Sequence, residues 1–94
     1  MTTEIINESS GNVFIDMGFP PDEAAILTMR AELMASLRET IAARHWTQAE
    51  AARVLGIAQS RVSDLVRGKW DKFSLDMLVT LATRAGRKVS LALT

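Results

Sequence analysis

The chain has 94 residues, 48% of them hydrophobic, which suits one domain with a thin core that dimerisation would strengthen. It contains no cysteine, which excludes a disulfide scaffold and a thiolate metal site. Its formal net charge is zero, and no apolar run approaches the roughly 20 residues that span a bilayer. The polar, acidic N-terminus lacks the features of a signal peptide, so we expect a cytoplasmic protein with no membrane partner.

The charges are distributed unevenly along the chain. Residues 1–41 hold seven acidic and two basic side chains, a net charge of −5. Residues 42–94 hold nine basic and four acidic side chains, a net charge of +5. A basic half favours contact with nucleic-acid phosphates, and an acidic half favours a basic protein partner. A solvated surface whose charges are separated by chance is the alternative.

The N-terminal residues 1–19 show no helical period. We predict a tail over 1–11, where Asn and Ser are frequent. Residues 12–19 (NVFIDMGF) are more apolar and partly alternating, which predicts a short extended segment. Pro20 and Pro21 then prevent any helix from continuing upstream.

A long helix is predicted from about Pro21 to His45. Proline favours the first helical turn, and the acids at 22 and 23 interact well with the positive end of the helix dipole. The length of this helix predicts that its N-terminal end extends beyond the core, with a break in the helix as the alternative. Apolar side chains recur along it at helical spacing, at Ile26, Met29, Leu33, Leu37 and Ile41, and Leu27 and Met34 widen this stripe.

Two short helices follow. Thr47 and Glu50 have the spacing of a capping box, which places a helix over about 48–54. Gly56 suits the positive φ that a sharp turn between helices needs. The next helix is predicted over about 59–67.

A loop rich in basic and aromatic side chains spans 69–73. We expect Trp70 to cover the core beside Phe73, with a place at an interface as the alternative. Ser74 is an N-cap for a further helix over about 75–85, since its hydroxyl can accept from the first backbone N–H groups.

The last segment, 87–94, alternates between apolar and polar side chains. Val89, Leu91 and Leu93 share one side, a pattern that predicts a strand. A lone strand leaves its backbone groups unpaired. The strand therefore pairs with its copy in a second subunit, which makes a symmetric dimer, or with residues 12–16; we favour the first.

The most informative stretch is 48–67, QAEAARVLGIAQSRVSDLVR. Two helices that cross closely need a small residue at the crossing, which Ala52 supplies, and a glycine in the turn, which Gly56 supplies. The second helix must also insert apolar side chains into the core, and three are available: Ile57, Val62 and Leu65. This spacing is typical of a helix-turn-helix.

Residues 47–68, TQAEAARVLGIAQSRVSDLVRG, resemble the DNA-binding core of the XRE family, which shares the fold of phage Cro and repressor proteins. The longer run from GNVFIDMGFPPDEA through GKWDKFSLDMLVTLATRAGRKVSL resembles XRE-type antitoxins of the HigA kind. One residue departs from the XRE pattern. The family often has Ser, Thr or Asp at the cap of the recognition helix, whereas this chain has Ala58, at a cost of roughly 0.5–2 kcal/mol of helix stability.

The resemblance implies an all-α, lambda-repressor-like bundle of about four to five helices, with a short C-terminal β-strand that pairs in a dimer. Residues 1–19 would form the tail and extended segment, and 20–94 the helix-turn-helix domain with its dimerisation strand. The implied partners are double-stranded DNA with a palindromic operator, a second copy of the chain, and a small basic RelE/HigB-like toxin whose operon the protein represses.

Burial of one face of the second short helix turns a polar face outward, and five residues on it are predicted to contact bases: Gln59, Ser60, Arg61, Ser63 and Asp64. Gln59 can bind adenine N6 and N7, and Arg61 can bind guanine O6 and N7 or a phosphate. Asp64 can accept from cytosine N4; its alternative is a structural pair with Arg61 or Arg67.

Phosphate contacts are predicted around this helix. Arg67, Lys69 and Lys72 flank its end and can neutralise phosphates, with an ordinary basic loop as the alternative. The resemblance adds Thr47 and Gln48, the latter also meeting Gln59.

Catalytic patterns are missing from the sequence. The single histidine, His45, has no partner at ligand or triad spacing, and no nucleophile or phosphate-loop motif is present. We therefore expect no enzyme, no metal and no cofactor. Two alternatives to the antitoxin remain: a stand-alone XRE-type regulator without a toxin, and a protein-interaction module that does not bind DNA.

Overall fold

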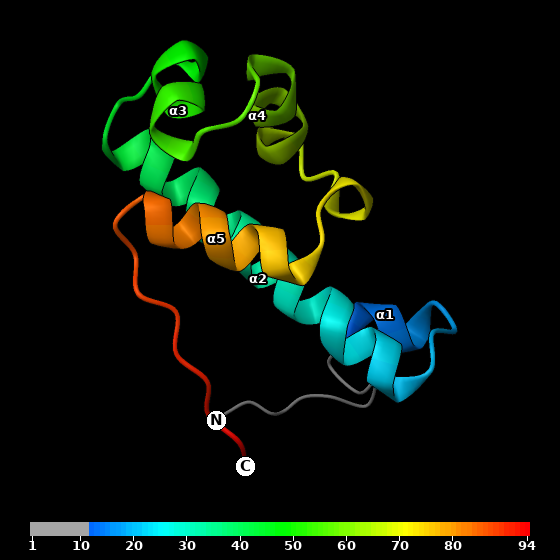
Figure 1. The fold of residues 1–94 in the computed structure, drawn as a ribbon. Helices are drawn as coiled ribbons and strands as arrows, with labels where there is room; N and C mark the ends of the chain where they lie inside the picture. Colours follow the sequence, from blue (N-terminus) through cyan, green and yellow to red (C-terminus); the bar gives the residue numbers. More distant parts are fainter. Residues whose placement is uncertain (1–11) are drawn as a thin grey trace.

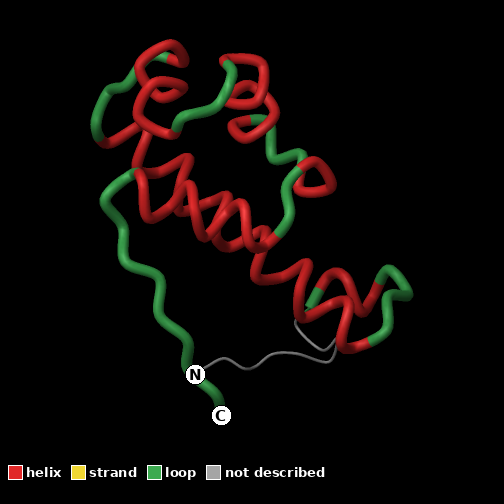
Figure 2. Tube along the Cα trace, in the orientation of Figure 1, coloured by secondary structure: helices red, strands yellow, loops and turns green. Residues whose placement is uncertain are grey.

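The structure, a computed structural model, describes residues 12–94, so the predicted tail over 1–11 lies outside the described residues. Five α-helices and one short 3-10 helix follow one another: α1 Val13–Asp16, α2 Pro21–Ala43, α3 Gln48–Leu55, α4 Gln59–Val66, η1 Trp70–Lys72 and α5 Leu75–Arg84. Residues 12–94 contain no strand (Figure 2). The prediction of an all-α helix-turn-helix bundle is confirmed.

The helix α2 runs the length of the molecule, and α5 packs along it (Figure 1). At one end, α3 and α4 lie over this pair; at the other end, α1 packs against the first turns of α2. The main core lies between α2, α3, α4 and α5, and its largest fully buried side chains are Phe73, Met34, Leu37, Leu55, Leu65, Leu78, Leu81 and Val62.

The first turns of α2 extend beyond this core, as predicted, but only part of the predicted apolar stripe is buried there. Ile26 and Met29 are 41% and 36% exposed, whereas Ala24 and Leu27 are buried. The reason is that α1, not the main bundle, covers this part of α2 and forms a second small cluster with it.

The prediction of an extended segment within 12–19 is wrong, because residues 13–16 form a helical turn. Asn12 caps it: its side-chain oxygen accepts from the backbone N–H groups of Phe14, at 2.9 Å, and Ile15, at 3.3 Å. An alternation of so few residues does not outweigh an N-cap. The helical turn also excludes 12–16 as a strand that pairs with the C-terminal segment.

The other helix boundaries follow the predicted signals. The capping box is present, with the Glu50 N–H donating to Thr47 Oγ1 at 3.1 Å and the Thr47 N–H donating to Glu50 Oε1 at 2.8 Å. Ser74 accepts from the Met77 N–H at 3.1 Å. Ala58 provides no side-chain cap for α4.

The C-terminal segment 87–94 has no regular secondary structure in this single chain. Its apolar side chains are exposed: Val89 by 39%, Leu91 by 78% and Leu93 by 89%. A strand here needs another strand beside it, so the predicted pairing with a second copy stays a prediction.

Candidate nucleic-acid interface

The angle between α3 and α4 is determined by a short turn and a buried seam. Gly56 adopts a left-handed conformation, with φ +72°, and the two helices bury four side chains against the core: Ala51, Leu55, Val62 and Leu65. From α5, Arg84 Nη1 donates to the Leu55 carbonyl at 2.8 Å and so satisfies one of the last carbonyls of α3. The helix α4 is therefore held against the bundle with its polar side outward.

The N-terminal end of α4 is open to solvent. Gln59 and Ser60 are exposed, as are Thr47 and Gln48 at the start of α3, whereas Ser63 is half-buried. Within residues 12–94, the side chains of Gln48 and Gln59 share no hydrogen bond, so the expected contact between them is not formed in this chain. These polar side chains are free to meet a ligand at this end of the molecule.

Arg61 turns away from this open end. Its guanidinium carbon lies 4.6 Å from the centroid of the Phe73 ring, and Nη2 donates to the Lys72 carbonyl at 3.3 Å. Its Nε is buried without a hydrogen-bond partner. In this conformation Arg61 joins α4 to the loop that follows it, a role that sequence reasoning missed because Phe73 is remote from α4 in sequence.

Asp64 has a structural partner, but it is neither Arg61 nor Arg67. Its carboxylate lies 3.9 Å from Lys69 Nζ, and both side chains keep contact with solvent, at 25% and 44% exposed. The chain turns back at Gly68, where the Lys69 N–H donates to the Asp64 carbonyl at 3.1 Å. This turn brings the two charges together, which helical spacing alone does not predict.

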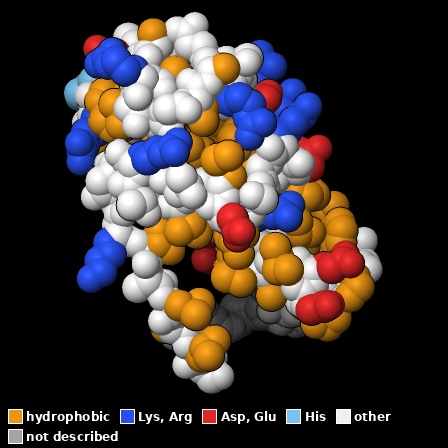
Figure 3. Space-filling model, in the orientation of Figure 1, with side chains coloured by type: hydrophobic (Ala, Val, Ile, Leu, Met, Phe, Trp, Pro, Cys, Tyr) orange, Lys and Arg blue, Asp and Glu red, His pale blue; other side chains and the backbone are white. Residues whose placement is uncertain are grey.

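The basic side chains past α4 lie on the surface. Arg67, Lys69 and Lys72 are all exposed. In Figure 3, lysine and arginine side chains gather over the end of the molecule that carries α3 and α4, and acidic ones are prominent at the end that carries α1. The charge asymmetry of the sequence is therefore also a separation in space.

Trp70 packs against the main core, as predicted, but it also contacts the second cluster. Its ring meets Phe14 of α1 edge to face, with centroids 5.6 Å apart. Within residues 12–94, no helix has the length and hydropathy to cross a membrane, and no group of three or more His, Cys, Asp or Glu side chains is arranged to hold a metal ion.

Two short helices joined by a glycine turn, with the polar side of the second exposed next to basic residues, define a helix-turn-helix protein. The sequence profile of the helix-turn-helix domain family matches residues 13–94, and the chain belongs to this family. A comparison with curated proteins finds no match. Membership of this family supports the resemblance to XRE proteins and indicates a DNA-binding regulator.

Proposed function

We propose that the protein is a sequence-specific transcriptional repressor that binds a palindromic operator in double-stranded DNA as a homodimer. One observation carries this proposal: the N-terminal end of α4 is exposed, and three exposed cations, Arg67, Lys69 and Lys72, follow the other end of the same helix (Figure 1). An exposed helix end of this kind enters the major groove, while flanking cations neutralise phosphates.

Within this proposal, Gln59, Ser60 and Ser63 contact bases, and Gln59 binds adenine through N6 and N7. The phosphate contacts come from both ends of the motif: Thr47, Gln48, Arg67, Lys69 and Lys72. Arg61 and Asp64 reach bases only after leaving Phe73 and Lys69, the partners they have in the free chain.

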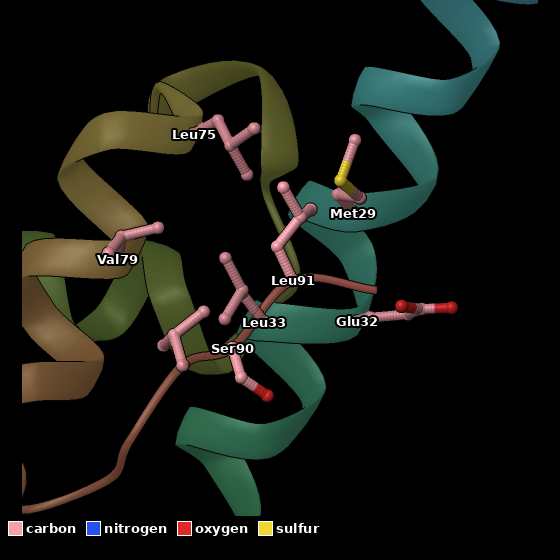
Figure 4. A pocket seen from close by; sticks show the side chains of 8 residues that line it. Met29, Glu32, Leu33, Leu75, Val79, Ser90 and Leu91 are labelled. Carbon is pink, nitrogen blue, oxygen red and sulfur yellow. The ribbon is translucent and has the colours of Figure 1, made fainter. Parts of the chain in front are cut away.

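The dimer is proposed to form through the C-terminal segment. Val89, Leu91 and Leu93 would form a strand that pairs with its copy, and the side chain of Leu91 already points toward a groove between α2 and α5 (Figure 4). This groove, of about 360 Å³, is mostly apolar and is lined by Met29, Glu32, Leu33, Leu75, Val79, Val89, Ser90 and Leu91. Paired subunits would place their recognition helices about 34 Å apart, one turn of the duplex.

Selection from a random duplex library with the purified protein tests DNA binding. We expect a palindromic consensus, to which Gln59→Ala binds about 6- to 150-fold more weakly, the equivalent of 1–3 kcal/mol. Binding of the same variant to non-specific DNA should change little. Thr83→Ala, an exposed neutral change on α5, is the matched control. If no sequence is enriched, the non-DNA interaction module becomes the better interpretation.

A narrower role as the antitoxin of a type II toxin–antitoxin operon, neutralising a RelE/HigB-like toxin, is also proposed. Its support is the resemblance together with the acidic, partly apolar end formed by α1 and the start of α2. Exposed residues there include Val13, Met17, Asp16, Asp22 and Glu23. Co-expression with any small basic protein encoded beside this gene tests the role: co-purification supports it, and its absence leaves a stand-alone regulator.

A further inference from the structure

The helix α1 and the start of α2 form a unit with its own small core. Phe14, Ala24 and Leu27 are buried there, and Phe19 and Ala31 pack against them. A short polar contact also holds this unit together, since Asn12 Nδ2 donates to Thr28 Oγ1 of α2 at 2.7 Å. We call residues 12–19 the N-terminal arm.

One side chain joins this unit to the main bundle. The indole of Trp70 packs against both clusters, and the ring of Phe14 meets it at an interplanar angle of 83°. Phe14 is only 7% exposed, so its ring is committed to this contact and to that with Phe19, whose centroid lies 6.1 Å away. The arm therefore supplies one of the contacts of the Trp70 ring.

Trp70 occupies the middle of the basic loop, which we define as residues 67–73. Lys69 precedes it, and Lys72 ends the 3-10 turn that Trp70 begins. The turn is held by backbone bonds, with the Lys72 N–H donating to the Lys69 carbonyl at 3.0 Å. Because these two lysines are on the same turn as the indole, the placement of Trp70 affects the backbone from which both lysine side chains extend.

The opposite side of the basic loop is held from the recognition helix. Arg61 donates to the Lys72 carbonyl and stacks over Phe73, whose side chain is 2% exposed. The loop thus has contacts on two sides, one with α4 and one with the N-terminal arm.

We propose that the N-terminal arm positions the basic loop for DNA through the contact between Phe14 and Trp70, although the arm lies at the acidic end of the molecule. Phe14 and Trp70 are positioning residues: they act through Lys69 and Lys72. This inference rests on the proposed DNA-binding function. On this proposal, release of the arm would weaken DNA binding.

Amide hydrogen exchange of the full-length protein, without DNA, tests the first step. In Phe14→Ala, we expect the amides of Lys72 and Phe73 to exchange about two- to tenfold faster, while those of α5 keep their wild-type rates. Asn12→Ala removes the cap of α1 without removing any ring and should produce the same pattern. Val13→Ala, on the exposed side of the same helix, is the matched control and should change nothing.

Titration of a duplex selected by the wild-type protein tests the second step. Phe14→Ala should bind roughly two- to thirtyfold more weakly, with unchanged base preference and a shallower salt dependence. Unchanged exchange in the basic loop, or unchanged affinity despite faster exchange, would overturn the proposal. If the wild-type protein selects no duplex, the proposed function fails, and the exchange data still decide whether the arm holds the loop.

Discussion

The contact that Arg61 forms in this chain differs from the one that its residue type and position predict. An arginine on the polar side of a recognition helix suggests guanine recognition, yet in this chain its guanidinium stacks on Phe73 and donates to the Lys72 carbonyl. A cation–π contact that is partly shielded from water contributes about 0.5–2 kcal/mol, so the side chain stabilises the fold before any DNA is present.

Replacement of Arg61 by alanine should therefore destabilise the free protein. We expect the free energy of unfolding to fall by about 1–2 kcal/mol, from the lost stacking and hydrogen bond. Urea denaturation measures this change, and Arg53→Ala, at an exposed arginine on α3, is the control. Equal stability of the two variants would show that the Phe73 contact contributes nothing.

Among the non-glycine residues in 12–94, His45 has a positive φ, of +57°. It follows the C-cap of α2, in a turn where the Trp46 N–H donates to the Ile41 carbonyl at 3.1 Å. The corresponding turns after α4 and α5 have glycine at this place, Gly68 and Gly86. A side chain in this conformation costs about 1–2 kcal/mol, part of which glycine recovers.

His45→Gly should raise the free energy of unfolding by up to about 1 kcal/mol, which shifts Tm by roughly 4–8 °C in a domain of this size. Thermal unfolding followed by circular dichroism measures the shift. Arg44→Gly is the control: that residue has ordinary helical φ, so glycine there should lower Tm. A lower Tm for His45→Gly would contradict the left-handed turn.

At the scale of elements, α3 and α4 are of equal length but differ in how they begin. Thr47 and Glu50 satisfy backbone donors of α3, whereas Ala58 leaves the first N–H groups of α4 without a side-chain acceptor. The helix proposed to enter DNA is therefore the one with the weaker N-terminus. Its free N–H groups remain available to water or to a phosphate.

Ala58→Ser should stabilise the protein by about 0.5–2 kcal/mol, because Ala58 already has the extended conformation of an N-cap, with φ −68° and ψ 152°. Chemical denaturation gives the change in unfolding free energy. Ala58→Val, which lacks an acceptor, is the control and should bring no gain. If serine and valine behave alike, the start of α4 is not limited by its cap.

At the scale of the whole molecule, charge and apolar surface are separated. On the face that Figure 3 shows, basic side chains gather over the end that carries α3 and α4, and acidic ones are prominent near α1. The apolar groove between α2 and α5 is only partly covered by the chain's own C-terminal segment. A single subunit offers one short recognition helix, so tight operator binding requires two linked subunits.

Leu91→Asp should prevent dimer formation without unfolding the subunit, because Leu91 is 78% exposed in the single chain. We expect a monomer in sedimentation velocity and a large loss of operator affinity. Ala92→Asp places the same charge on the other side of the predicted strand and should remain dimeric. A dimer in the Leu91→Asp variant would show that the C-terminal segment is not the interface.

Local signals were sufficient for most helix boundaries. The capping box at Thr47, the turn at Gly56 and the cap at Ser74 involve residues only a few positions apart, so sequence reasoning located them correctly. At residues 12–19 the alternation of apolar and polar side chains led to a wrong prediction of an extended segment, because the cap at Asn12 favours a helical turn. The predicted base and phosphate contacts remain predictions. Three of the predicted base-contacting residues are half-buried in the single chain: Arg61, Ser63 and Asp64.

By itself, the sequence determined the helix-turn-helix, its caps and turns, and the opposite charges of the two halves, because each depends on neighbouring residues or on composition. Only the tertiary structure decided which face of the first turns of α2 is buried, where the guanidinium of Arg61 lies, and that Trp70 meets Phe14. These features depend on side chains that are distant in sequence and meet only when the helices pack, so no local pattern encodes them.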